Sequence, residues 1–171
     1  MTFYVVLLAL FAVERLAELI ISKRNIAWSM GRGGRESGAG HYPAMVALHT
    51  ALLVGALVEV VVAHRPFLPW LGWPMLAIVV AAQSLRWWCI RTLGRRWNTR
   101  IVVLPDVPLV TSGPYRWIRH PNYVAVVVEG IALPLVHTAW ITAITFTALN
   151  AWLLTVRIRA ENRALAAVPA A

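Results

Sequence analysis

The sequence predicts an all-α integral membrane protein with about five transmembrane helices. Of its 171 residues, 60% are hydrophobic and only 13% are charged, and the mean hydropathy is +0.67. Soluble domains usually carry about 25% charged residues, so this composition excludes an ordinary soluble domain and a disordered chain. Several apolar stretches also reach the roughly 20 residues that a membrane helix needs.

Three of these stretches satisfy the length requirement directly. They comprise residues 2–21, 43–63 and 70–90. The first contains Glu14, Arg15 and Glu18 and follows no basic segment. We therefore interpret it as a retained span and not as a cleaved signal peptide.

A fourth apolar stretch, residues 122–156, is too long for a single span. Pro134 and His137 interrupt it. We expect a C-terminal helical hairpin there, with helices at 122–136 and 138–156 joined by a tight turn. The whole chain, residues 1–171, is then a single membrane domain.

Basic residues are concentrated in three segments of the chain, which has a net charge of +9. Thirteen of the 16 Lys and Arg residues lie in residues 22–42, 91–121 and the tail 157–171. With five spans, these segments share one side of the membrane, and Arg65 alone lies on the other. The positive-inside rule then places the C-terminus in the cytoplasm and the N-terminus outside. We attribute the charge to this orientation and do not expect a nucleic-acid partner.

The first and second of these basic segments differ in their predicted order. Residues 22–42 contain five glycines and are expected to form a flexible loop. Residues 91–121 contain the apolar run Ile101–Leu104, and turns are fixed near Pro108 and Gly113. Because long loops in compact proteins are often functional, we predict an ordered, partly embedded 91–121 loop with a short extended piece.

The densest group of polar and aromatic side chains is Gly-Pro-Tyr-Arg-Trp-Ile-Arg-His-Pro-Asn-Tyr at residues 113–123. Pro121 suits the first turn of a helix, which places Arg119 and His120 at its N-terminus. Free N–H groups and the positive end of the helix dipole favour an anion there, such as a cofactor carboxylate. Aromatic and basic residues also anchor proteins at membrane interfaces, and we favour that alternative for Trp117.

A second group follows the last span. Arg157 and Glu161 are four residues apart and share one helix face. Asn162 could offer a ligand both a donor and an acceptor. The alternative is a surface ion pair, worth a few tenths of a kcal/mol.

Polar residues within the apolar stretches are expected to face the bundle interior, either as a structural network or in a function. They are Glu14, Arg15, Glu18, Glu59, Gln83, Arg86, Glu129 and Asn150. Other motifs are absent: the sequence has neither a dinucleotide-binding Gly-x-Gly-x-x-Gly nor a Walker A motif. Its histidines show no ligand spacing and Cys89 is its single cysteine, so no metal site is predicted.

Together these motifs resemble the isoprenylcysteine carboxyl methyltransferase family of integral membrane enzymes. The resemblance covers about residues 93–165. It rests on Gly113-Pro-Tyr115, Arg119-His-Pro-Asn-Tyr123 and Arg157-x-x-x-Glu161. Leu93-Gly-x-x-Trp-Asn-Thr-Arg-Ile101 and Glu161-Asn-x-Ala-Leu165 are similar to the short bacterial branch of the family.

The resemblance implies S-adenosyl-L-methionine as methyl donor, bound by an ordered cytoplasmic cofactor loop and the hairpin. The implied cofactor-binding residues are Leu109, Val110, Gly113, Tyr115, His120, Tyr123 and Glu161, to which we add Asn162 for its donor and acceptor groups. The resemblance also places Arg157 near the methyl acceptor, and the chemistry of their side chains makes Arg119 and Glu161 further candidate catalytic residues. Many eukaryotic-type members have a paired Glu-Glu where this chain has Glu161-Asn162.

We therefore expect an O-methyltransferase whose lipophilic substrate enters from the bilayer, such as a prenylcysteine-like molecule or an alkylpyrone. A carboxylate or an acidic enol would need no base, and Arg157 or Arg119 could hold it. A neutral phenol would need one, for which Glu161 and His120 are candidates. Two alternatives remain, an NADPH-dependent membrane reductase of related fold and a non-enzymatic small membrane transporter or subunit.

Overall fold

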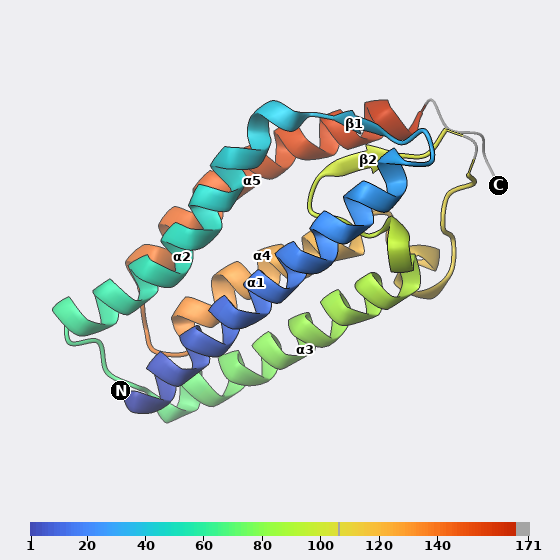
Figure 1. Cartoon of the computed structure of the whole chain (residues 1–171). Coiled ribbons are helices and arrows are strands. Elements are labelled where there is room, and N and C mark those ends of the chain that lie inside the picture. The colour runs from blue at the N-terminus through green and yellow to red at the C-terminus, as the bar shows by residue number, and fades with distance from the viewer. Residues whose placement is uncertain (106, 167–171) are drawn as a thin grey trace.

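The computed structural model describes residues 1–105 and 107–166, and five long helices dominate this part of the chain. They are α1 (Thr2–Met30), α2 (Tyr42–Val62), α3 (Pro69–Leu93), α4 (Pro121–Leu135) and α5 (Trp140–Leu165). Figure 1 shows them packed side by side, with the N-terminus and the 91–121 loop at opposite ends of the bundle. The last five residues of the expected tail, 167–171, lie outside the described residues.

The all-α membrane class is confirmed. Within residues 1–105 and 107–166, the helices long and apolar enough to cross a membrane are α2, α3 and α5. Helix α1 is long enough, but it carries three charged residues in its apolar half. Helix α4 has 15 residues, about 22 Å of helix, less than the roughly 30 Å of the hydrocarbon core. That α1 and α4 also span the membrane stays a prediction.

Helix α4 lies at the centre of the bundle, with α3 on one side and α5 on the other. The predicted hairpin is present, because α4 ends at Leu135 and α5 begins at Trp140. Gly130 allows close packing of the two helices, since a side chain there would overlap the ring of Phe146. At the turn, Glu59 of α2 accepts hydrogen bonds from the first free N–H groups of α5.

The expectation of a flexible loop at residues 22–42 is wrong over most of its length. Helix α1 continues nine residues beyond the expected end, and β1 (Arg35–Ser37) pairs antiparallel with β2 (Ile101–Val103). The helix continues because polar side chains on one face of α1 bind the 91–121 loop. Ser22 hydrogen-bonds Thr99 at 2.9 Å, and Asn25 donates to the Trp97 carbonyl at 2.6 Å.

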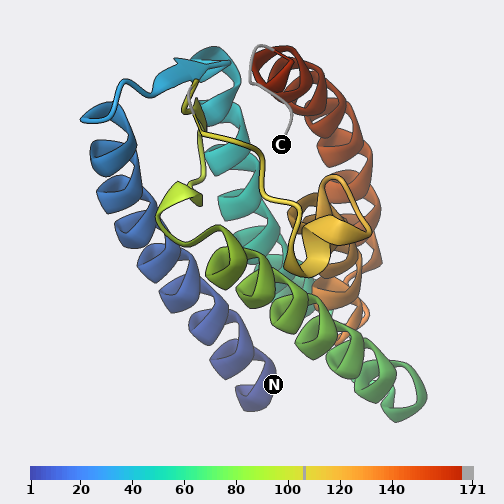
Figure 2. The ribbon, with the colours of Figure 1, turned by 90° about the vertical axis from the view of Figure 1, so that its right-hand side faces the viewer.

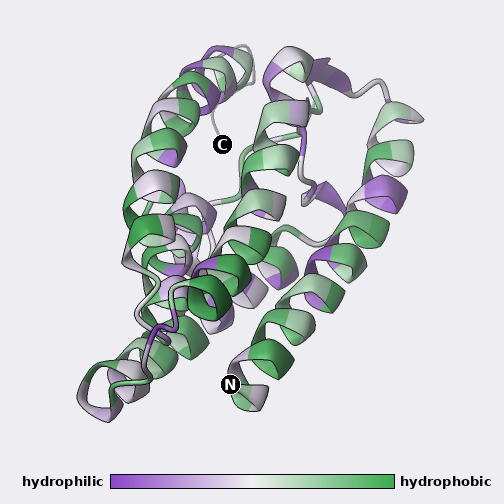
Figure 3. Ribbon diagram, turned by 90° about the vertical axis from the view of Figure 1, so that its left-hand side faces the viewer, coloured by the Kyte–Doolittle hydropathy of each residue, from purple (hydrophilic) through white to green (hydrophobic). Residues whose placement is uncertain are grey.

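The 91–121 loop is ordered and contains the expected extended piece, β2. Two short 3₁₀ turns flank it, η2 (Gly94–Arg96) and η3 (Gly113–Arg116). Figure 2 shows the loop crossing one end of the bundle between α1 and α5. Figure 3 shows hydrophilic residues gathered at this end, whereas hydrophobic residues cover most of the helices. Residues 157–165 of the expected tail directly continue α5.

Candidate active site

A cavity of about 470 Å³ opens at the end of the bundle that the 91–121 loop covers. Cavities of roughly 300–1,000 Å³ are typical of small-molecule sites. The 91–121 loop, including β2, forms one wall with both apolar and basic side chains, and the N-terminus of α4 and the last turns of α5 form the other. Among the described residues, its ionisable or phenolic lining side chains are Arg96, Arg100, Tyr115, Arg116, Arg119, His120, Tyr123, Arg157 and Glu161.

The start of α4 faces this cavity. Pro121 occupies the first turn, as the sequence predicted, and His120 precedes it. Within the described part of the chain, no side chain caps this helix N-terminus. The Oδ1 atom of Asn122 is buried without a hydrogen-bond partner there. Pro121 has no N–H, and the N–H groups of Tyr123 and Val124 donate to the His120 carbonyl at 3.1 and 3.4 Å. Among the described residues, the N–H of Asn122 has no acceptor, so it is available to an anionic group at the positive end of the helix dipole.

Tyr123 and Glu161 meet across the cavity. The Tyr123 hydroxyl donates to Glu161 Oε2 and accepts from Arg157 Nε at 2.8 Å. The two ends of the candidate site, the start of α4 and the end of α5, are thus joined by one hydrogen-bonded chain. Arg157 and Glu161 lie on the same face of α5, as their spacing predicted.

Arg157 is already engaged by the protein itself. It is 6% exposed. Its Nη2 donates to the Thr99 carbonyl at 2.7 Å, and Nη1 lies 3.1 Å from the sulfur of Met45. With Nε on Tyr123, the guanidinium ties α2, α4, α5 and the loop together. Its contact with a methyl acceptor stays a prediction, and its geometry favours a positioning role.

His120 completes the group. Its Nε2–H donates to Asn162 Oδ1 at 3.1 Å, because that amide oxygen can only accept. Its Nδ1 lies 3.7 Å from Glu161 Oε1, and its ring stacks on Tyr123 with centroids 5.3 Å apart. The fold thus brings His120, Tyr123, Glu161 and Asn162 together from two separate motifs.

Of the other residues that the resemblance implied for cofactor binding, three line the cavity and Gly113 does not. Leu109, Val110 and Tyr115 line the cavity. Burial chiefly raises the pKa of the Tyr115 phenol, which keeps it a neutral group. Gly113 does not line the cavity. Its φ is +58°, and a Cβ there would lie 2.5 Å from Thr92 Oγ1, so it lets η3 approach α3 closely.

Two cavity arginines, Arg116 and Arg119, have an available guanidinium. Both are exposed, and neither makes a hydrogen bond or ion pair with any residue in 1–105 or 107–166, although Arg116 lies over the ring of Trp117. By contrast, Arg100 pairs with Glu36 at 3.2 Å and Arg96 donates to the Pro108 carbonyl at 2.9 Å. No group of three His, Cys, Asp or Glu residues that could hold a metal ion occurs among the described residues.

The sequence analysis gave no role to Thr99, Met45 or Ser22. Thr99 holds Arg157 through its carbonyl and Ser22 through its N–H and hydroxyl. The sequence does contain a pattern that indicates the continuation of α1 beyond residue 21. Ser22, Asn25 and Ser29 recur at three- and four-residue spacing, which places them on one helix face.

Known proteins resemble the chain over most of its length. The sequence profile of the isoprenylcysteine carboxyl methyltransferase (ICMT) family matches residues 75–167. An uncharacterized protein of Bacillus subtilis, YpbQ, is 39% identical over 160 residues, which are 93% of this chain and 94% of that protein. An uncharacterized protein of Haemophilus influenzae is 27% identical over 168 residues, covering 96% of both chains.

Proposed function

Because the chain belongs to the isoprenylcysteine carboxyl methyltransferase family, we propose that it uses S-adenosyl-L-methionine to methylate an oxygen atom of a lipophilic substrate. Family membership indicates a membrane methyltransferase. The cofactor and the acceptor are the proposed part. The observation that carries it is the meeting of His120, Tyr123 and Glu161 at a cavity beside the uncapped start of α4.

The cavity residues fit this cofactor. The N-terminus of α4 suits its carboxylate, and Glu161 suits a cationic group or a ribose hydroxyl. Asn122 and Asn98 line the cavity, and each has a buried Oδ1 without a partner among the described residues, so amino groups could donate to them. The apolar side chains of Leu109 and Val110 suit an adenine ring.

When bound, this cofactor supplies a methyl group on a positively charged sulfur, which an acceptor oxygen takes with its own electron pair while sulfur keeps the pair of the broken bond. The protein then mainly has to align the two molecules and exclude water. Arg119 is available to hold an acceptor carboxylate or enolate, which needs no base. For a neutral phenol, Glu161 or His120 would take the proton.

The basic end of the bundle supports the proposed orientation in the inner membrane. The 91–121 loop and the end of α5 share this end with the cavity. We propose that it faces the cytoplasm, from which the polar cofactor enters, with the N-terminus outside. The lipophilic acceptor would enter from the bilayer between the helices, where membrane lipids are the surrounding partners.

Calorimetric titration of the detergent-purified protein with S-adenosylhomocysteine tests the cofactor assignment, with NADPH as the comparison. We expect saturable binding of S-adenosylhomocysteine alone. The arginine-rich lining would also suit phosphate groups, which keeps an NADPH-dependent reductase as the second candidate. Binding of NADPH alone would favour that candidate, and binding of neither by folded protein would favour a non-enzymatic membrane protein.

A further inference from the structure

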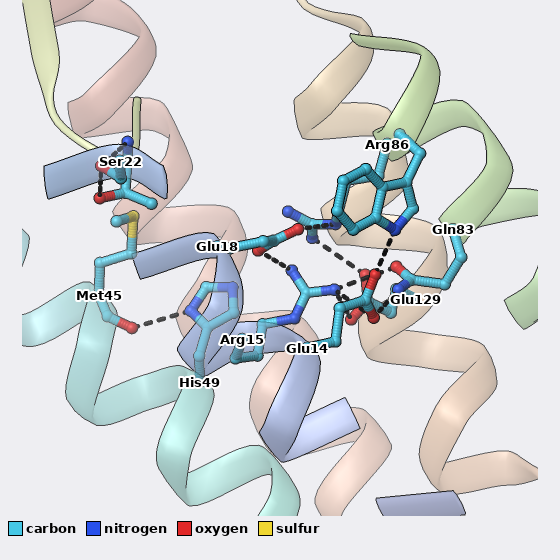
Figure 4. A network of polar contacts seen from close by, with 11 residues as sticks. Glu14, Arg15, Glu18, Ser22, Met45, His49, Gln83, Arg86 and Glu129 are labelled. Atoms are coloured by element: carbon cyan, nitrogen blue, oxygen red, sulfur yellow. Dashed lines mark hydrogen bonds and ion pairs between the residues drawn. The ribbon is translucent and has the colours of Figure 1, made fainter. Parts of the chain in front are cut away.

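A network of charged side chains lies inside the bundle, apart from the cavity lining. Figure 4 shows it between α1, α3 and α4. Arg15 of α1 contacts Glu18 at 2.7 Å and Glu129 of α4 at 3.3 Å. Arg86 of α3 contacts Glu129 at 2.9 Å. Glu18, Arg86 and Glu129 are only 3%, 4% and 6% exposed, so this part of the network is buried even before a bilayer surrounds it, whereas Glu14 and Arg15 are half-buried.

The charges of this network do not balance. Among the described residues, α1 contributes Glu14, Arg15 and Glu18, α3 contributes Arg86, and α4 contributes Glu129. Three carboxylates thus face two guanidinium groups. Glu14 is otherwise held by neutral groups, since the indole of Trp87 and the amide of Gln83 donate to it.

Among the described residues, His49 of α2 is the other titratable group facing the network (Figure 4). Its Nδ1 lies 2.8 Å from the Met45 carbonyl, so this nitrogen carries a proton and donates it to that oxygen. A neutral imidazole can make this hydrogen bond, so the contact requires no charge on His49. An unbalanced ionised carboxylate in an apolar interior is so costly that such a group normally takes up a proton. The imbalance therefore points to one proton held within the network.

The unpartnered atoms indicate where that proton resides. Five of the six carboxylate oxygens lie against a nitrogen of Trp87, Gln83, Arg15 or Arg86. The sixth oxygen, Oε1 of Glu18, lies 3.7 Å from Arg86 Nε, which is too far for a hydrogen bond. Neither of these two atoms has a hydrogen-bond partner within residues 1–105 and 107–166. A proton on this oxygen displaces no existing hydrogen bond.

We propose that the network is a proton-binding site and that Glu18 carries the proton on Oε1 at neutral pH. The protonated network has no net charge, which allows α1 to pack against α3 and α4 inside the membrane. Glu18 lies one helical turn before Ser22, which holds Thr99 of the 91–121 loop. The site therefore stabilises the α1 face that supports the cavity, whatever reaction the cavity performs.

Infrared spectroscopy of the protein in lipid vesicles at pH 7 tests this proposal, because protonated and ionised carboxyl groups absorb at different frequencies. We expect a band from a protonated carboxyl group in the wild type and its loss in Glu18→Gln. The band should remain in the control Glu59→Gln, which removes a carboxylate held by Arg65 and the start of α5. No such band in the wild type, or its persistence in Glu18→Gln, would overturn the proposal.

Thermal unfolding gives a second, independent readout. A glutamine resembles a protonated glutamate, so Glu18→Gln should fold and keep its Tm within a few degrees of the wild type. Glu129→Gln should lower the Tm clearly, because Arg86 loses its ionised partner. The wild-type Tm should also fall as pH rises above neutral, since the folded state holds a proton that the unfolded state releases, and Glu18→Gln should flatten this decline. Failure of Glu18→Gln to fold, or the opposite ranking of the two variants, would contradict the proposal.

Discussion

The substitution Tyr123→Phe tests the hydrogen-bonded chain across the cavity. The hydroxyl it removes donates to Glu161 and accepts from Arg157, while the ring that stacks on His120 is kept. Leaving a buried polar group without its partner costs about 1–3 kcal/mol. If that cost falls on the cofactor-binding conformation, affinity for S-adenosylhomocysteine drops by about 5- to 150-fold. Calorimetric titration of the purified protein measures this change directly.

Tyr4→Phe is the matched control. The Tyr4 hydroxyl donates to the Leu133 carbonyl at 3.1 Å, fully buried at the opposite end of the bundle. Both variants lose a buried hydroxyl, so both should lower the Tm. Only the substitution at residue 123 should weaken binding. Unchanged affinity in folded Tyr123→Phe, or an equal loss in Tyr4→Phe, would refute the reasoning.

Three further predictions follow from the site and its supports. Glu161→Ala and His120→Ala should each abolish S-adenosylhomocysteine binding in the same titration, and wild-type binding by both would contradict the site assignment. Gly113→Ala should lower the Tm more than Gly94→Ala. Both glycines have positive φ, +58° and +54°, but only at Gly113 would the added Cβ meet a neighbouring side chain. Equal losses of Tm would argue against the close approach of η3 to α3. Arg86→Met should lower the free energy of unfolding by about 3–5 kcal/mol, since it removes the cation that lies 2.9 Å from Oε2 of the buried Glu129 carboxylate. A loss below about 1 kcal/mol in denaturant titrations would contradict the pairing.

Local sequence rules predicted the C-terminal half well. The interruption at Pro134 and His137 located the hairpin turn. Pro121 marked the first turn of α4, and the four-residue spacing of Arg157 and Glu161 placed both on one helix face. Each of these features depends on neighbours within a few residues, which is the range over which helix periodicity and proline geometry act.

Long-range contacts were beyond such rules. The antiparallel pairing of Arg35–Ser37 with the 91–121 loop joins segments far apart in the sequence, and no local periodicity encodes it. The same holds for Glu59 of α2, whose carboxylate accepts hydrogen bonds from the first N–H groups of α5. The role of Arg157 in holding Thr99 also depends on the tertiary fold, so spacing alone left its guanidinium available for a substrate.

The central claim is transfer of a methyl group to an oxygen of a lipophilic acceptor. The most direct measurement incubates the purified protein with S-adenosylmethionine labelled in its methyl group and, separately, an alkylpyrone or a prenylcysteine analogue. We predict that label enters the organic extract with at least one acceptor in the wild type and with neither in Glu161→Ala. Absence of labelled product with both acceptors, from folded wild-type protein that binds S-adenosylhomocysteine, would contradict the claim for these acceptor classes.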